Sequence, residues 1–181
     1  MFRRLTQALL STIYPNVCEV CGTPLVEGED MLCLTCRADL PVTNFHLRPD
    51  FNAIHERTFC HAGIERAAAY FYYERHSPYA QPIQTAKYRH RPNVGRKLMR
   101  EYAKTLLPTG FFDGIDLIEP VPLSTTKLIS RGYNQSYWIA QGVSDVTGIP
   151  IGASLKARRH SSQTSATQQL AAEMPHRHII R

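Results

Sequence analysis

The sequence contains no run of 18 apolar residues, which is about the length that a membrane-spanning helix needs. Acidic residues are also scarce, with 15 Asp and Glu against 21 Lys and Arg, and the net charge is +6. A basic balance favours phosphate-rich partners only weakly, because many soluble proteins are basic. Hydrophobic residues still make up 43% of the chain, which is enough to form a core.

No small-residue cleavage site precedes Cys18, so we expect no export signal and predict a cytoplasmic protein.

Four of the five cysteines are concentrated near the N-terminus in two Cys-x-x-Cys pairs, Cys18 with Cys21 and Cys33 with Cys36. Each spacing lets two thiolates turn toward one ion, and four thiolates in a tetrahedron suit Zn²⁺. Disulfides are one alternative, but they need an oxidising compartment. A redox Cys-x-x-Cys is another, but it usually stands alone at the start of a helix. The pattern favours a structural zinc site that leaves no coordination position open for catalysis.

The fifth cysteine, Cys60, precedes His61 in a stretch at 41–62 that resembles a linker. In one interpretation, these two residues form a second metal site together with His46 or His55. In the commoner one, an isolated cysteine is a small buried hydrophobic residue.

Hydrophobic periodicity predicts alternating strands and helices in the rest of the chain. Residues 64–73 end in an aromatic run typical of a strand, and 95–107 carry apolar residues at helical spacing. A short strand at 117–121, a helix capped by Asn134 and a short strand at 149–155 follow. This order predicts an α/β fold with a parallel sheet. The aromatic run also suits a stacking platform for single-stranded nucleic acid, although a place in the core is commoner.

A basic, hydroxyl-rich segment joins the predicted strand at 117–121 to the helix that Asn134 caps. Lys127 adds a positive charge, and Arg131 supplies a planar fork of hydrogen-bond donors. Gly132 allows the backbone to approach a ligand closely, and a helix N-terminus attracts anions. These features suit phosphate or pyrophosphate. The alternative interpretation is a solvated connecting loop with one capping residue.

The segment Pro120-Val121-Pro122-Leu123, followed by Arg131-Gly132-Tyr133-Asn134-Gln135-Ser136, resembles the ComF family of competence and DNA-utilisation proteins, which is related to the amidophosphoribosyltransferases. The resemblance implies a type I phosphoribosyltransferase-like parallel sheet and an N-terminal zinc ribbon. It implies a pyrophosphate-facing site at Lys127, Arg131, Gly132 and Asn134, and a secondary basic patch at Lys87, Arg89 and Arg159. Implied partners are phosphoribosyl pyrophosphate, single-stranded DNA and proteins of the competence machinery.

The sequence departs from that family at the loop that binds phosphoribosyl pyrophosphate. This loop follows an apolar strand and two acids, and reads Thr/Ser-Thr/Ser-Gly. Adjacent acids occur here only at Glu29-Asp30, and no such loop follows them. We therefore expect a C-terminally incomplete sheet, from a shortened gene product or one completed by a partner, and assign no catalytic residue. The alternative function is a non-enzymatic zinc-ribbon protein that binds nucleic acid or a partner in DNA uptake.

These observations predict three parts. A short helix at 2–13 and the zinc ribbon occupy 1–40, a linker occupies 41–62, and the partial phosphoribosyltransferase-like domain occupies 63–181.

Overall fold

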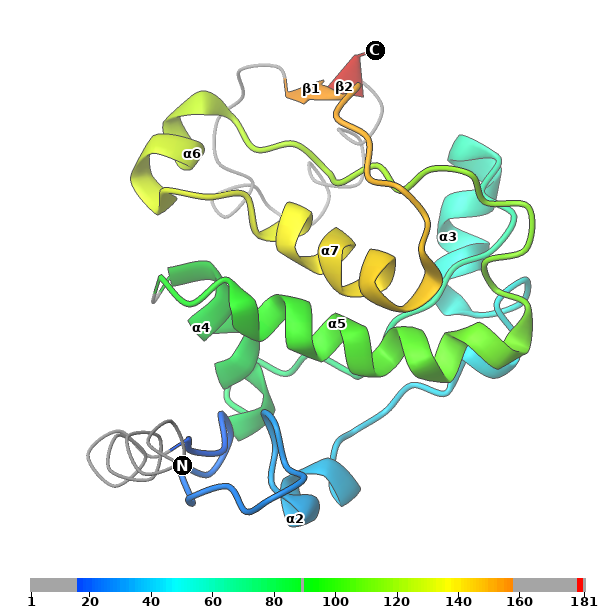
Figure 1. Cartoon of the computed structure of the whole chain (residues 1–181). Helices are drawn as coiled ribbons and strands as arrows, with labels where there is room; N and C mark the ends of the chain where they lie inside the picture. The colour runs from blue at the N-terminus through cyan, green and yellow to red at the C-terminus, as the bar shows by residue number, and fades with distance from the viewer. Residues whose placement is uncertain (1–15, 89, 158–178, 181) are drawn as a thin grey trace.

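The computed structural model describes residues 16–88, 90–157 and 179–180, and these residues form a mostly helical structure (Figure 1). The helices are α2 (Leu34–Ala38), α3 (Ala53–Ala62), α4 (Gln81–Tyr88), α5 (Asn93–Leu106), α6 (Thr125–Arg131) and α7 (Gln135–Thr147). Three 3-10 turns, η1 (Phe45–Leu47), η2 (Pro78–Ala80) and η3 (Leu107–Thr109), connect them. The strands β1 (Lys156–Ala157) and β2 (Ile179–Ile180) form a two-residue antiparallel pair. None of the described helices is both long and apolar enough to cross a membrane.

Helices α5 and α7 lie side by side at the centre of the molecule (Figure 1). The helical spacing predicted for 95–107 is confirmed, because Tyr102 and Leu106 are buried on one face of α5. The start of α7 is also confirmed, since the Asn134 side chain accepts a hydrogen bond from Ser136 N at 3.0 Å. Gly148 ends α7 in the left-handed conformation (φ 74°), which glycine adopts without a steric penalty.

The two central helices approach closely at Gly142. A Cβ atom at this position would overlap Arg96 O and lie 2.9 Å from Arg100 N, so only glycine fits against the α5 backbone. Arg96 also reaches across to α7, where its Nε and Nη2 atoms donate to the two carboxylate oxygens of Asp145, each at 2.7 Å. These hydrogen bonds lower the pKa of Asp145. The pair therefore joins the helices by a bidentate contact as well as by packing.

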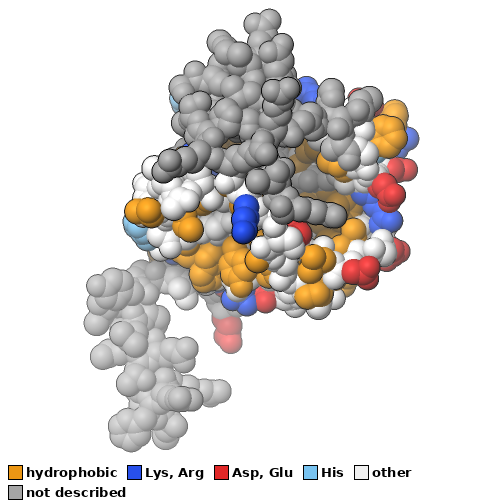
Figure 2. Space-filling view, turned by 90° about the horizontal axis from the view of Figure 1, so that it is seen from above, with side chains coloured by type: hydrophobic (Ala, Val, Ile, Leu, Met, Phe, Trp, Pro, Cys, Tyr) orange, Lys and Arg blue, Asp and Glu red, His pale blue; other side chains and the backbone are white. Residues whose placement is uncertain are grey.

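The predicted parallel sheet is wrong for the described residues. Its central strand contributes a single parallel bridge between Ile118 and Ile151, with Ile118 N donating to Pro150 O and Gly152 N donating to Ile118 O. Proline lacks the N–H donor, so Pro120 cannot extend this ladder. Three apolar side chains of the segment remain 44–57% exposed, namely Ile115, Leu117 and Val121. Figure 2 views the molecule from above the orientation of Figure 1 and shows hydrophobic side chains at the surface of that face.

The strand predicted at 64–73 is reduced to an isolated antiparallel bridge between Phe71 and Val42. Tyr72 N donates to Pro41 O at 2.9 Å, and Ala67 N donates to Pro49 O at 2.8 Å. Tyr102 Oη on α5 donates to Ala69 O at 2.9 Å. The aromatic run therefore packs against α5 and against residues 41–49 rather than joining a sheet.

The segment 41–62, predicted as a linker, contains η1 and α3. Asn52 caps α3 and is buried, with Oδ1 accepting from Ile54 N at 3.0 Å and Nδ2 donating to Ala67 O at 2.8 Å. The segment is therefore anchored to the body of the protein. The helix predicted at 2–13 lies outside the described residues.

We predict that Gly142→Ala lowers the free energy of unfolding by about 1–3 kcal/mol, because an added methyl group would meet backbone atoms of α5 that cannot yield without separating the helices. Gly95→Ala is the matched control in α5. A Cβ there would make ordinary contacts of 3.6 Å with Ala86 and Ile139. Urea denaturation should show Gly95→Ala unchanged or stabilised by up to ~1 kcal/mol. Equal destabilisation by both substitutions would contradict this packing.

Candidate metal centre and basic pocket

The two cysteine pairs are presented by two different local structures. In the first, Gly22 N donates to Cys18 O at 2.9 Å and Cys18 N donates to Thr23 O at 2.8 Å, which closes a tight turn around Cys21. Gly22 has a φ of 75°, as expected for the residue after such a pair. In the second, Cys33 is the N-cap of α2 and Cys36 lies within that helix.

All four sulfur atoms lie within 4.8 Å of one another, so Cys18, Cys21, Cys33 and Cys36 could together hold a metal ion. The sulfurs of Cys21 and Cys33 are 3.7 Å apart. A tetrahedron with metal–sulfur bonds of about 2.3 Å has sulfur–sulfur edges of roughly 3.8 Å, which agrees with that separation. The separation of 3.7 Å between the Cys21 and Cys33 sulfurs is far longer than a disulfide bond of about 2.05 Å, in line with a metal site rather than the disulfide alternative.

The surroundings of the sulfurs affect their ionisation in opposite directions. The side-chain hydrogen bond with Thr23 is the main cause that lowers the pKa of Cys21 to about 6. Burial raises the pKa of Cys36, since its thiolate would be poorly solvated. A bound cation supplies the positive charge that a buried thiolate lacks, which is the usual reason that metal binding releases thiol protons.

The cysteine module, which we define as residues 16–40, packs against α4 and α5 (Figure 1). Cys18 and Cys36 belong to one cluster of buried residues together with Ala86 of α4 and Val94 of α5. Met31 and Leu32 complete this cluster from within the module. Two of the four clustered cysteines are therefore also part of the core that joins the module to the helices.

Ion pairs surround this shared core. Asp30 of the module accepts from Lys97 Nζ at 2.6 Å and from Arg100 Nη2 at 2.8 Å, and Glu19 pairs with Arg91 at 2.7 Å. The side chains of the two Asp30 pairs are partly exposed, so each of these pairs contributes little free energy by itself, whereas the Glu19 side chain is only 8% exposed. Their placement fixes which face of α5 meets the module.

A basic pocket of about 350 Å³ lies between α6 and α4. Lys127 and Arg131, one helical turn apart on α6, face Lys87 at the end of α4 across this pocket. Its other lining residues are Tyr88, His90 and Ser130. No carboxylate stands among the described residues that line it, so the three cations make it a site for an anion.

The guanidinium group of Arg131 is held in place by neutral partners. Its Nη1 atom donates to Gln135 Oε1 at 2.8 Å, and Nη2 donates to Tyr88 Oη at 3.4 Å. The guanidinium carbon lies 5.0 Å from the centre of the Tyr88 ring, within range of a cation–π contact. Because its charge is not neutralised by a carboxylate among the described residues, Arg131 can still bind an anion.

Gly132 and Asn134 position the elements beside the pocket but do not line it. Gly132 ends α6 with a φ of 76°. Asn134 caps α7, and its Nδ2 atom donates to Val121 O at 3.1 Å. Tyr133, between them, donates its hydroxyl to Ala86 O at 2.7 Å and so ties this turn to α4. Burial raises the pKa of Tyr133, which keeps the hydroxyl protonated as a donor.

The predicted secondary basic patch is only partly visible. Lys87 lies in the same pocket as Lys127 and Arg131, whereas Arg89 and Arg159 lie outside the described residues, as do the side chains of Cys60 and His61. Sequence reasoning missed Tyr88, His90 and Ser130 as lining residues. It treated 124–131 as a loop, although Thr125–Arg131 form α6. Ser124 before this stretch and Gly132 after it were the available signals for a helix, since these residue types are common at helix ends.

Comparisons with protein-family models, with curated proteins and with solved structures found no match to this chain. The resemblance to the ComF family therefore stays a prediction from the residues quoted above.

We predict that the purified protein carries about one equivalent of a tightly bound metal ion per chain and that Cys36→Ala loses it, because three thiolates leave the tetrahedron open. Cys60→Ala removes the same chemical group from a position that is not one of these four cysteines and should retain the metal. Inductively coupled plasma mass spectrometry gives the stoichiometry. Less than a few tenths of an equivalent in the wild type, or equal loss in both variants, would contradict the site.

Proposed function

We propose that this chain binds the phosphate or pyrophosphate group of a small-molecule ligand in the basic pocket. The observation that carries the proposal is that Lys127 and Arg131 of α6 converge with Lys87 of α4 on one pocket. Three cations around a cavity repel one another, and a multiply charged anion relieves that repulsion. Arg131 adds a planar pair of donors that matches phosphate oxygens.

We propose further that the cysteine module holds Zn²⁺, since four cysteine sulfurs within 4.8 Å of one another suit the four-thiolate coordination of this ion. With four protein ligands, zinc would act as a structural support and not as a Lewis acid. The cysteine module has a small core of its own, so metal binding would supply part of its folding free energy.

The resemblance to the ComF family supports a cytoplasmic role in competence or DNA use, with phosphoribosyl pyrophosphate as one ligand to test. The proposal for this chain is binding and not catalysis. Anion binding requires only that Lys127 and Arg131 lie in one pocket, as they do here, and does not require the parallel sheet of that family.

Isothermal titration of the zinc-loaded protein with inorganic pyrophosphate and with phosphoribosyl pyrophosphate tests this function. We expect binding at millimolar or tighter affinity, weakened about 10- to 100-fold in Arg131→Ala, because charge-assisted hydrogen bonds contribute roughly 1.5–3 kcal/mol. Arg57→Ala, on exposed α3, removes the same charge on the other side of the molecule (Figure 1) and should bind like the wild type.

Absence of binding to both compounds would contradict the proposal. If the protein instead binds single-stranded DNA with an affinity that falls steeply with salt, the alternative of a nucleic-acid-binding protein would be favoured. Equal weakening by Arg57→Ala and Arg131→Ala would indicate a general charge effect and would also contradict a specific pocket.

A further inference from the structure

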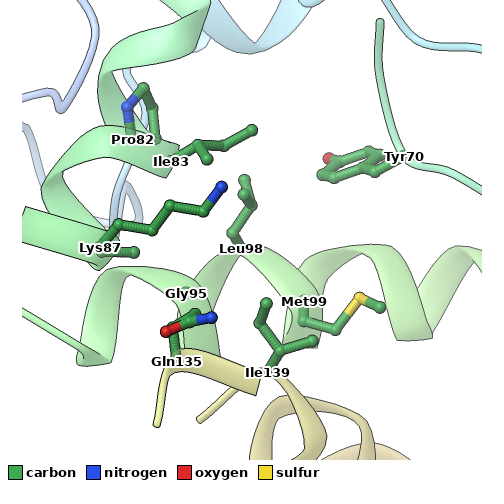
Figure 3. Close-up of a pocket in the computed structure, with 10 residues that line it drawn as sticks. Tyr70, Pro82, Ile83, Lys87, Gly95, Leu98, Met99, Gln135 and Ile139 are labelled. Atoms are coloured by element: carbon green, nitrogen blue, oxygen red, sulfur yellow. The ribbon is translucent and has the colours of Figure 1, made fainter. Parts of the chain in front are cut away.

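A second cavity, which we call the apolar slot, lies among α4, α5 and α7 and has a volume of about 120 Å³. Figure 3 shows side chains from all three helices around it, with Ile83 from α4, Leu98 and Met99 from α5, and Ile139 from α7. Tyr70 covers another side of the slot. Its ring stacks on that of Tyr102, with the two ring centres 4.6 Å apart. The slot is therefore built from the central helices of the molecule.

The surface that faces the slot is almost wholly apolar. Its walls are not packed as a closed core, since Ile139 remains 38% exposed and Leu98 and Met99 are only partly buried. Apolar surface left in contact with water is unfavourable, so an apolar group that fills the slot would gain free energy.

The slot adjoins the basic pocket. Lys87 lines both cavities, and Gln135 of the slot accepts the hydrogen bond from Arg131 of the basic pocket at 2.8 Å. Figure 3 shows Lys87 and Gln135 on the same side of the slot. A single molecule can thus place an apolar group in one cavity and an anionic group in the other.

We infer that the ligand of this protein is a phosphate or pyrophosphate ester of a small apolar alcohol, with its hydrocarbon group in the apolar slot and its anionic group in the basic pocket. This inference rests on the anion binding proposed above and adds the chemical class of the organic group. The charge of Lys87 at the boundary complements the anion, while the slot selects the hydrocarbon group.

The size and polarity of the slot limit that group. An apolar cavity of roughly 150 Å³ holds a benzene molecule, so 120 Å³ limits the group to a short hydrocarbon of at most about five carbons. A group with many hydrogen-bonding edges would lose its contacts with water there and find few partners, which is costly. The slot therefore favours a hydrocarbon over a polar ring or sugar.

The test compares isopentenyl pyrophosphate with methyl pyrophosphate by isothermal titration of the zinc-loaded full chain. The two esters share one headgroup and differ only in the hydrocarbon. Each buried methylene strengthens binding about fourfold, so we expect isopentenyl pyrophosphate to bind at least tenfold more tightly. Ile83→Trp, which fills the slot, should remove this difference and leave methyl pyrophosphate binding unchanged. Leu47→Trp, at an exposed position in η1, is the matched control and should preserve it.

Equal affinities for the two esters would overturn this inference and leave the proposed function standing. The two esters would also bind with equal affinity if the slot instead held an apolar segment of a partner protein. A difference that survives in Ile83→Trp would also overturn it, because the hydrocarbon would then bind elsewhere. If neither ester binds although inorganic pyrophosphate does, this inference fails and the proposed function stands, whereas absence of binding by both esters, inorganic pyrophosphate and phosphoribosyl pyrophosphate would overturn both.

Discussion

The contact on which the rest of this structure depends is the burial of cysteine side chains against α4 and α5. Cys18 and Cys36 face the other two cysteines on one side and share a buried cluster with Ala86 and Val94 on the other. A metal ion would fix the positions of these sulfurs, and the cluster would pass that constraint to the helices. Ala86 also accepts the Tyr133 hydroxyl at 2.7 Å, next to Arg131. The candidate metal centre and the basic pocket are therefore connected by adjacent contacts.

Helix α5 links the parts of the molecule because its faces have different partners. Lys97 and Arg100 reach Asp30 of the cysteine module, whereas Arg96 binds Asp145 of α7. Partly exposed ion pairs of this kind contribute little stability individually, so their main effect is to set the orientation of each neighbour. The larger stabilisation comes from packing at Gly142 and from the buried face of α5. Both cavities depend on this arrangement, since α4 lines both of them, α5 and α7 complete the slot and α6 completes the basic pocket.

The sequence was informative where the structural signal is local. Spacing of two residues brings Cys33 and Cys36 to the same side of a turn, and the Asn134 cap marks the start of α7. The sheet was predicted wrongly because strand propensity does not reveal hydrogen-bond partners distant in sequence. The aromatic run at 64–73 bonds to Pro41 and Pro49 instead of to neighbouring strands. The sequence placed Lys87 in a secondary basic patch, whereas its position opposite Lys127 and Arg131 depends on how α4 and α6 meet, which no local pattern reveals.

Hydrogen–deuterium exchange before and after metal removal is the measurement that tests the central claim most directly. If the metal centre holds α4 through the shared cluster, chelation should increase amide exchange in Gln81–Tyr88 and around Tyr133. Exchange in α3, which lies away from the cysteine module (Figure 1), should change far less. Unchanged protection of α4 after complete removal of the metal would show that the pocket is supported independently and would contradict the account.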